Sequence, residues 1–191
     1  MFGQVFILTF IFGNSLAIQP SAGCGKTLPD SPKPGEHHRF FFEHNDVLLG
    51  AIERDFIVQI PKDFDNTSPI PLLFDVHWYA GSAPKQVNYS PWTEVALREN
   101  LVIVWPNGMN DTKSGSGSGS WNVSSTFGSK GPICDLNRGN WPPPNECFES
   151  CPLCDESYSC DWTTCYDDIG FLEVVIETVQ GGLISKDLRD Y

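Results

Sequence analysis

The chain has 191 residues, of which 40% are hydrophobic and 13% aromatic. This length and composition suit one globular domain with a buried core and exclude a disordered tail. The formal net charge is -12 at pH 7. Because so acidic a chain is repelled by polyanions, we expect neither nucleic acid nor a membrane surface as a partner.

The first residues have the pattern of a secretory signal. Residues 2–12 (FGQVFILTFIF) form an apolar run that is too short to span a bilayer, and Ser15-Leu16-Ala17 offers the small residues that a signal peptidase requires. We therefore predict a signal peptide over residues 1–17, a mature domain over residues 18–191 and a secreted protein. The 7 cysteines agree with an oxidising compartment.

In an exported protein, N-glycosylation sequons can be used as acceptor sites. The candidate acceptors are Asn66, Asn110 and Asn122, each followed two residues later by Ser or Thr. Asn88 heads a poorer sequon, because Pro91 follows its Ser. All of them fall in segments expected to be loops.

The first expected elements are two strands that follow a lead-in rich in Pro, Gly and Ser. Residues 38–42 (HRFFF) and 55–60 (DFIVQI) have strand composition, and Pro61 ends the second strand. Residues 46–53 between them are expected to form the turn of an antiparallel pair.

The next segment, residues 71–82 (PLLFDVHWYAGS), changes abruptly from apolar to aromatic and polar residues. The run Leu72–Val76 predicts a fully buried strand. Ligand sites of open α/β sheets lie beyond the carboxyl ends of strands, so His77, Trp78 and Tyr79 occupy a candidate site.

A helix and a second buried strand follow. Residues 91–100 begin with Pro after Ser90, a candidate N-cap, and carry apolar side chains at helical spacing. Residues 101–105 (LVIVW) predict a buried strand that stops at Pro106. Strand, helix and strand at this spacing predict a βαβ unit, so the two buried strands should be parallel.

Regular periodicity is lost over residues 107–164, which we interpret as a Cys-rich insertion. Residues 167–179 then predict a helix with one apolar stripe, and Asp167 and Asp168 at its start favour the helix dipole. Residues 185–191 have the character of a lead into another strand.

Disulfides are the expected role of the cysteines. Cys151 and Cys154 form a C-x-x-C pair that could begin a zinc site, but a second close pair of Cys or His is missing, so we predict no metal. The pairing stays open, and the odd count leaves one cysteine over, with Cys24 the natural candidate. The candidates are Cys24, Cys134, Cys147, Cys151, Cys154, Cys160 and Cys165.

Nucleophilic hydrolysis needs a Ser or Cys, a His base, an acid and an oxyanion site. The chain has 4 His and no G-x-S-x-G nucleophile elbow. Residues 115–119 alternate Gly and Ser, yet no strand precedes them, so they predict a flexible surface run.

Six short motifs in order carry a resemblance to a known family: SAGCGK (21–26), FIVQIP (56–61), PLLFDVHWYAGS (71–82), VIVWPNG (102–108), SWN (120–122) and DDIGF (167–171). Together they resemble the secreted feruloyl esterase and polyhydroxybutyrate depolymerase-like esterases, which are α/β hydrolases. The resemblance covers nearly the whole mature chain, although the Cys-rich insertion departs from the family pattern. It implies an α/β fold with an incomplete α/β-hydrolase-type sheet, seen through its amino-terminal half.

The resemblance also implies a serine acyl-enzyme mechanism without any cofactor. The backbone N–H of Trp78 or Tyr79 would be an oxyanion donor, His77 a structural residue, and Trp121 and Asn122 neighbours of the site. Nucleophile, acid and base are expected beyond Tyr191, so the chain alone should be inactive. The implied substrate is a small-molecule or polymeric ester, with a plant-wall phenolic ester as one class.

Two alternatives stay open at this point. The chain could be a secreted non-catalytic binding protein with a Cys-rich loop, or a catalytically dead relative. Trp78 and Tyr79 could simply cover the end of the sheet. Aromatic side chains at Trp121, Trp141 and Trp162 could form platforms for sugars or aromatic rings, or pack within the insertion.

Overall fold

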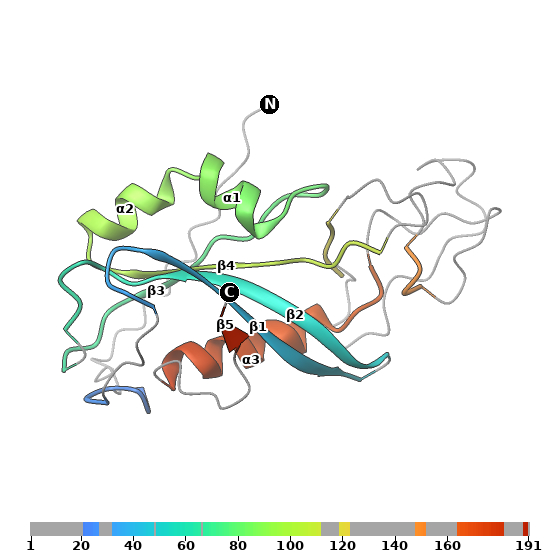
Figure 1. Ribbon diagram of the computed structural model, residues 1–191, viewed down its shortest axis with the longest axis horizontal. Coiled ribbons are helices and arrows are strands. Elements are labelled where there is room, and N and C mark those ends of the chain that lie inside the picture. The colour runs from blue at the N-terminus through green and yellow to red at the C-terminus, as the bar shows by residue number, and fades with distance from the viewer. Residues whose placement is uncertain are drawn as a thin grey trace, which may run out of the picture.

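A computed structural model describes residues 21–26, 32–47, 49–65, 67–111, 119–122, 148–151, 164–181 and 189–190. These residues form a mixed sheet with helices on both faces (Figure 1). The strand order is β3-β4-β2-β1-β5. None of the helices in this part of the chain is both long and apolar enough to cross a membrane.

The centre of the sheet is a long antiparallel hairpin. Strand β1 (His37–Asp46) pairs with β2 (Gly50–Gln59) from His37 opposite Gln59 to Asp46 opposite Gly50. The predicted antiparallel pair is confirmed, but residues 46–53 are mostly strand and the turn is much tighter. The sequence underestimated the length of both strands because their exposed positions carry polar residues. Gly50, at φ +79°, supplies the left-handed conformation of the turn.

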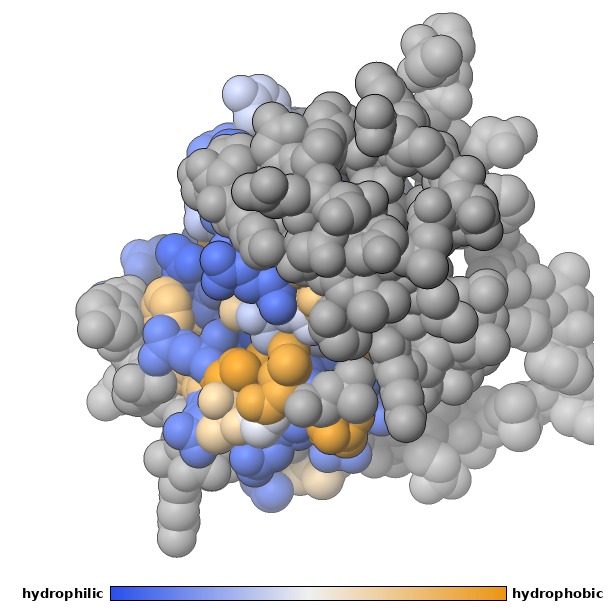
Figure 2. Space-filling model, turned by 90° about the vertical axis from the view of Figure 1, so that its right-hand side faces the viewer, coloured by the Kyte–Doolittle hydropathy of each residue, from blue (hydrophilic) through white to orange (hydrophobic). Residues whose placement is uncertain are grey.

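The end of the hairpin carries exposed apolar side chains. Val47 is 78% exposed and Leu49 is 43% exposed. Figure 2 shows the molecule from the side toward which this turn projects, with an apolar patch among hydrophilic residues. Scattered exposed apolar residues are normal for a protein surface.

Strands β3 (Leu72–Phe74) and β4 (Val102–Pro106) are parallel, as predicted, with Leu72 opposite Val102. Every residue of β4 is buried, whereas β3 is only half-buried and Val76 is 45% exposed. The expectation of a fully buried strand over residues 72–76 was therefore wrong. The physical reason is position: β3 ends the strand order and is covered less well than the interior strand β4.

The last described residues return to the opposite edge of the sheet. Strand β5 (Arg189–Asp190) pairs antiparallel with β1, placing Asp190 opposite Phe40. The sequence indicated strand character here without indicating the partner.

Helices α1 (Ala83–Tyr89) and α2 (Trp92–Arg98) lie on one face of the sheet, and α3 (Asp168–Gln180) lies on the other (Figure 1). Helices α2 and α3 were predicted. Helix α1 was missed because its 7 residues carry no apolar stripe; its start depends on the Ser82 hydroxyl, which accepts from Lys85 N at 3.4 Å.

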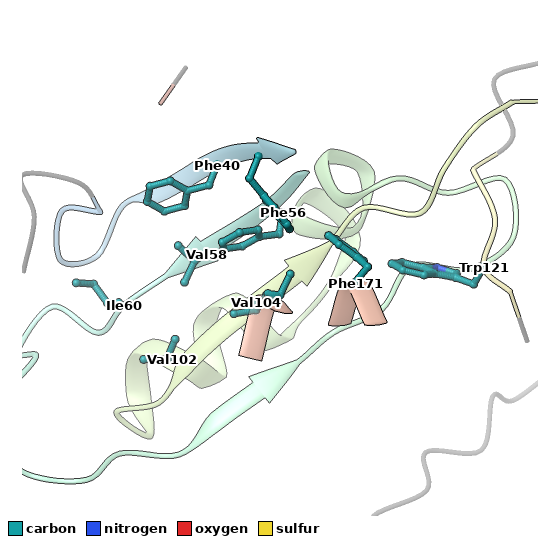
Figure 3. Close-up of a cluster of buried hydrophobic side chains, with 10 residues drawn as sticks. Phe40, Phe56, Val58, Ile60, Val102, Val104, Trp121 and Phe171 are labelled. Atoms are coloured by element: carbon teal, nitrogen blue, oxygen red, sulfur yellow. The ribbon is translucent and has the colours of Figure 1, made fainter. Parts of the chain in front are cut away.

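Two apolar layers hold these elements together. Between the sheet and α3 lies a cluster that Figure 3 shows in close-up: Phe40, Phe42, Phe56, Val58, Ile60, Val102, Val104, Trp121, Phe171 and Val175. On the opposite face of the sheet, Ile57, Ile103 and Trp105 of β2 and β4 form a second cluster with Ala83 of α1 and Ala96 of α2. The period of 2 in β2 and β4 thus divides one sheet between two cores.

A disulfide joins the short segment at residues 148–151 to the residues that precede α3. It links Cys151 with Cys165, and Cys165 N donates to Ser150 Oγ at 3.0 Å. Cys24 is a free thiol. The remaining predicted disulfide candidates, at positions 134, 147, 154 and 160, lie outside the described residues.

We predict that replacing both Cys151 and Cys165 by Ser lowers the free energy of unfolding by about 3 kcal/mol, because the bond closes a loop of about 15 residues in the unfolded chain. Urea unfolding measures the change. Cys24→Ser, at the free thiol, is the control and should differ little from the parent. A double variant as stable as this control would contradict the prediction.

Candidate functional site

The loops that follow β3 and β4 meet at the carboxyl ends of these parallel strands. Residues 75–82 follow β3 and residues 107–111 follow β4. Residues 119–122 join them through two isolated bridges, Gly81 with Gly119 and Met109 with Ser120. This is the place where an open α/β sheet offers a site.

His77 lies at the centre of the three segments and is only 2% exposed. Its Nε2 accepts a hydrogen bond from Gly108 N at 2.9 Å, so the proton of the neutral ring is on Nδ1, which donates to Trp78 O at 2.8 Å. The His77 carbonyl accepts from Trp121 Nε1 at 3.0 Å. Both ring nitrogens are therefore engaged in holding backbone.

Burial lowers the pKa of His77, and the bond to the Trp78 carbonyl opposes this only in part. A neutral ring matches the bond that Nε2 accepts. The arrangement suits a structural group better than a general base, whose Nε2 would have to be open to a nucleophile.

Three glycines make room for the His77 ring. A Cβ atom on Gly81 or Gly108 would come within 3.0 Å of a ring nitrogen, and one on Gly119 within 3.3 Å of ring Cε1. Since the ring is buried and bonded on both sides, it has nowhere to move.

The adjoining turn is closed by Gly81 N, which donates to Trp78 O at 2.9 Å. Ala80 has φ +61°, a left-handed conformation that non-glycine residues seldom adopt. Its N–H donates to Gly119 O at 2.8 Å, which holds the turn against the neighbouring segment.

Asp75 fixes the base of this loop. Its carboxylate accepts from Gln86 Nε2 at 2.7 Å, from Trp105 Nε1 at 3.0 Å and from the Ser90 hydroxyl. One side chain thus joins the end of β3 to the middle of α1, to its C-cap Ser90 and to β4.

Asn107 fixes the base of the loop that follows β4. Its Nδ2 donates to Asp55 Oδ1 at 2.9 Å, and its Oδ1 accepts from Ala83 N at 2.8 Å. The start of α1 is thereby tied to β2 through a residue of the second loop.

A buried ion pair lies beneath the loops. Arg54 Nη2 contacts Asp168 Oδ1 at 2.7 Å, and both side chains are almost fully buried. Asp168 Oδ2 also accepts from Asn122 N at 2.5 Å. Burial raises the pKa of Asp168, and Arg54 opposes this rise.

The structure corrects the expected role of Asp168. Asp167 is the N-cap of α3, and its side chain accepts from Gly170 N at 3.0 Å. Asp168 points inward to Arg54 instead of simply facing the helix dipole. The buried arginine decides this, and nothing local in the sequence indicates it.

The other residues singled out from the sequence have different surroundings in the structure. Trp78 is 50% exposed and lies edge-on to Tyr89, while Tyr79 is half-buried. Trp121 is buried, with its ring 5.0 Å from that of His77, so it is core and not a surface platform. Trp141 and Trp162 lie outside the described residues.

Asn122 is close to the site, through its backbone bond to Asp168 and through Nδ2, which donates to Tyr166 O at 2.9 Å. Sequence reasoning missed Arg54, Asp75 and Asn107, and it gave Asp168 only a role at the helix dipole. A charged or amide residue at an inward position of a strand, such as Arg54 in β2, is the signal that could have found some of them. No group of three or more metal-binding side chains occurs in the described ranges.

No profile of a known protein family matches the chain. It is similar to the probable feruloyl esterase C of Aspergillus clavatus, at 25% identity over 58% of this chain and 37% of that protein. It is also similar to feruloyl esterase C of Emericella nidulans, at 32% identity over 30% of this chain and 23% of that protein.

The probable feruloyl esterase C of Aspergillus terreus gives 26% identity over 49% of this chain and 32% of that protein. The chain thus spans about a quarter to two fifths of the length of these relatives. These partial matches relate it to esterases.

Gly108→Ala should lower the free energy of unfolding by about 1–3 kcal/mol, because the added methyl group meets Ser120 O and the buried His77 ring. Urea unfolding checks this. Asn110→Ala, at an exposed neighbour in the same loop, is the control. Equal stability of the two variants would show that the His77 packing is looser than described.

His44 of β1 gives a pH prediction. It is 6% exposed, its Nε2 has no partner among the described residues, and burial and then Arg54 lower its pKa from 6.5. The unfolded chain therefore takes up this proton first as the pH falls below 6.5, and stability decreases.

His44→Leu should weaken the loss of stability between about pH 7.5 and about pH 5, because it removes one such group. Urea unfolding at both pH values measures this against the parent. Asn45→Leu, at the exposed next residue of β1, controls for the added Leu. An unchanged pH dependence in His44→Leu would refute the assignment.

Proposed function

We propose that the chain is the amino-terminal half of a secreted serine esterase of the α/β-hydrolase type. The observation that carries this is the backbone of Trp78 and Tyr79, held around buried His77 at the carboxyl ends of parallel β3 and β4. The partial identity to proteins named feruloyl esterase C supports it. From that name we infer a carboxylic ester with a phenolic acyl group, small or attached to a plant-wall polymer, as substrate.

The proposed reaction is acyl transfer to water through a serine acyl-enzyme. The nucleophile attacks the ester carbonyl, the carbonyl oxygen becomes an oxyanion, and a His base with its acid manages the proton. The backbone N–H of Trp78 or Tyr79 would be one oxyanion donor. Such a donor works only at a fixed position, and here Asp75, His77 and the Ala80 turn supply that rigidity.

The proposal assigns the nucleophile, acid and base to sequence beyond Tyr191, because residues 1–191 contain no nucleophile elbow. Residues 18–191 alone should then hydrolyse neither p-nitrophenyl esters nor methyl ferulate in a serine-inhibitor-sensitive way. Such hydrolysis by the purified chain would sink this assignment.

The oxyanion role is tested in the gene product read past residue 191, with methyl ferulate as substrate. Trp78→Pro removes the backbone N–H, whereas Trp78→Ala removes the side chain and keeps the backbone N–H. If Trp78 is the donor, the Pro variant should lose about 10²–10³ in kcat relative to the Ala variant. The same pair at Tyr79 tests the other donor.

Thermal unfolding of all four variants shows which are folded and can be compared. Equal kcat in the Pro and Ala variants of both positions, in folded proteins, would contradict the oxyanion assignment.

The missing elbow also favours a second candidate, a secreted non-catalytic protein that binds through its Cys-rich insertion. The transcript distinguishes the two. A following strand with G-x-S-x-G, and later an Asp and a His, supports the esterase, and a stop codon after Tyr191 supports the binding protein or an inactive relative.

A further inference from the structure

Two predicted acceptor asparagines next to the candidate site, Asn110 and Asn122, lie among the described residues and have opposite surroundings. Asn110 is exposed, while its neighbours are fixed on both sides. Before it, Met109 O accepts from Ser120 N at 2.9 Å; after it, Asp111 O accepts from Glu149 N at 2.9 Å and Asp111 Oδ2 accepts from Ser150 N at 2.6 Å. Backbone contacts on both sides of Asn110 are thus satisfied without its side chain, which is left to solvent.

Asn122 has the reverse arrangement. Its Nδ2, the atom that would carry a glycan, donates to Tyr166 O at 2.9 Å, and its N–H donates to Asp168 Oδ2 at 2.5 Å. It follows buried Trp121. A sugar on Nδ2 would have to fit beside a backbone that Asp168 holds, against the start of α3.

We propose that Asn110 is an N-glycan acceptor of the mature protein and that Asn122 is not. The inference rests on the proposed export. In the secretory pathway the Nδ2 of Asn110 attacks the anomeric carbon of a lipid-linked pyrophosphate oligosaccharide. The new bond joins Nδ2 to this carbon, the bond from the carbon to the pyrophosphate oxygen breaks, and Nδ2 loses one proton.

Transfer precedes folding, so both sequons meet the transferase as extended chain. The difference arises afterwards. A glycan at exposed Asn110 projects into solvent and leaves the described contacts of the loop in place. A glycan at Asn122 competes with the bond to Tyr166 and disturbs the ion-pair cluster, so chains that carry it should fold poorly and be retained.

The glycan would have a defined location. Asn110 lies between the loop that packs on His77 and the segment that the Cys151–Cys165 disulfide ties down. A hydrophilic oligosaccharide there would lie at the junction between these two parts.

The experiment expresses the full chain in a glycosylating yeast, once with its own residues 1–17 and once with a host signal peptide in their place. Secreted and membrane-enclosed pools are digested with peptide N-glycosidase in heavy-oxygen water, and peptides are analysed by mass spectrometry. We expect heavy-oxygen Asp at position 110 in most molecules of both pools and unmodified Asn at position 122 in the secreted pool.

Matched variants remove each sequon without altering its Asn. Thr112→Ala should abolish the mass shift at position 110, and Ser124→Ala should leave the glycan content of the secreted protein unchanged. An unoccupied Asn110 in either pool, or an occupied Asn122 in the secreted protein, overturns the proposal. Secretion with the host signal alone, and an occupied Asn110, would refute the native signal peptide and retain the glycan assignment.

Discussion

The ion pair between Arg54 and Asp168 is the interaction on which most of the described structure depends. It joins β2 to α3 across the core, and Arg54 also lies 3.8 Å from the centre of the Phe171 ring. Burying two charges is costly, and here the cost is offset by the pair itself, by the Asn122 N–H on Asp168 and by the Asn107 carbonyl on Arg54. Both asparagines belong to the loops around His77. The ion pair that joins the helix to the sheet therefore also holds the loops of the candidate site in position relative to the sheet.

The parts of the fold that follow from local pattern could be predicted from the sequence. Several neighbouring residues are enough to predict the apolar run of β4, the apolar stripe of α3 and the aromatic strands of the hairpin. Helix α1 could not be found this way, since its start depends on a hydroxyl and an Asn107 side chain that is distant in sequence. The burial of β3 was overestimated because an apolar run shows strand character and does not show whether the strand lies inside a sheet or at its end.

The place of the His77 loop at the carboxyl end of the sheet could also be predicted, whereas the contacts that hold this loop could not. A buried strand that stops at His-Trp places a loop at the carboxyl end of a sheet, and that inference needs only the neighbouring residues. The partners of His77 come from three separate segments, and Arg54 meets Asp168 over a sequence separation of 114 residues. Such contacts follow from the folded topology. The pairing of Cys151 with Cys165 also follows from the folded topology. From the sequence alone, Cys154 in the adjacent C-x-x-C pair was an equally available partner for Cys151.

The left-handed Ala80 has a further consequence for any chemistry at this loop. Glycine would adopt φ +61° without strain, but it would also give the unfolded and partly open loop many more conformations. Alanine at this position introduces a small local strain but leaves the unfolded loop fewer conformations than glycine would. The strained conformation is kept because Gly119 O and the Trp78 carbonyl accept hydrogen bonds that hold the turn in place. The amides of Trp78 and Tyr79 are therefore preorganised, so in their proposed role as oxyanion donors they would lose little conformational entropy on binding a negatively charged oxygen.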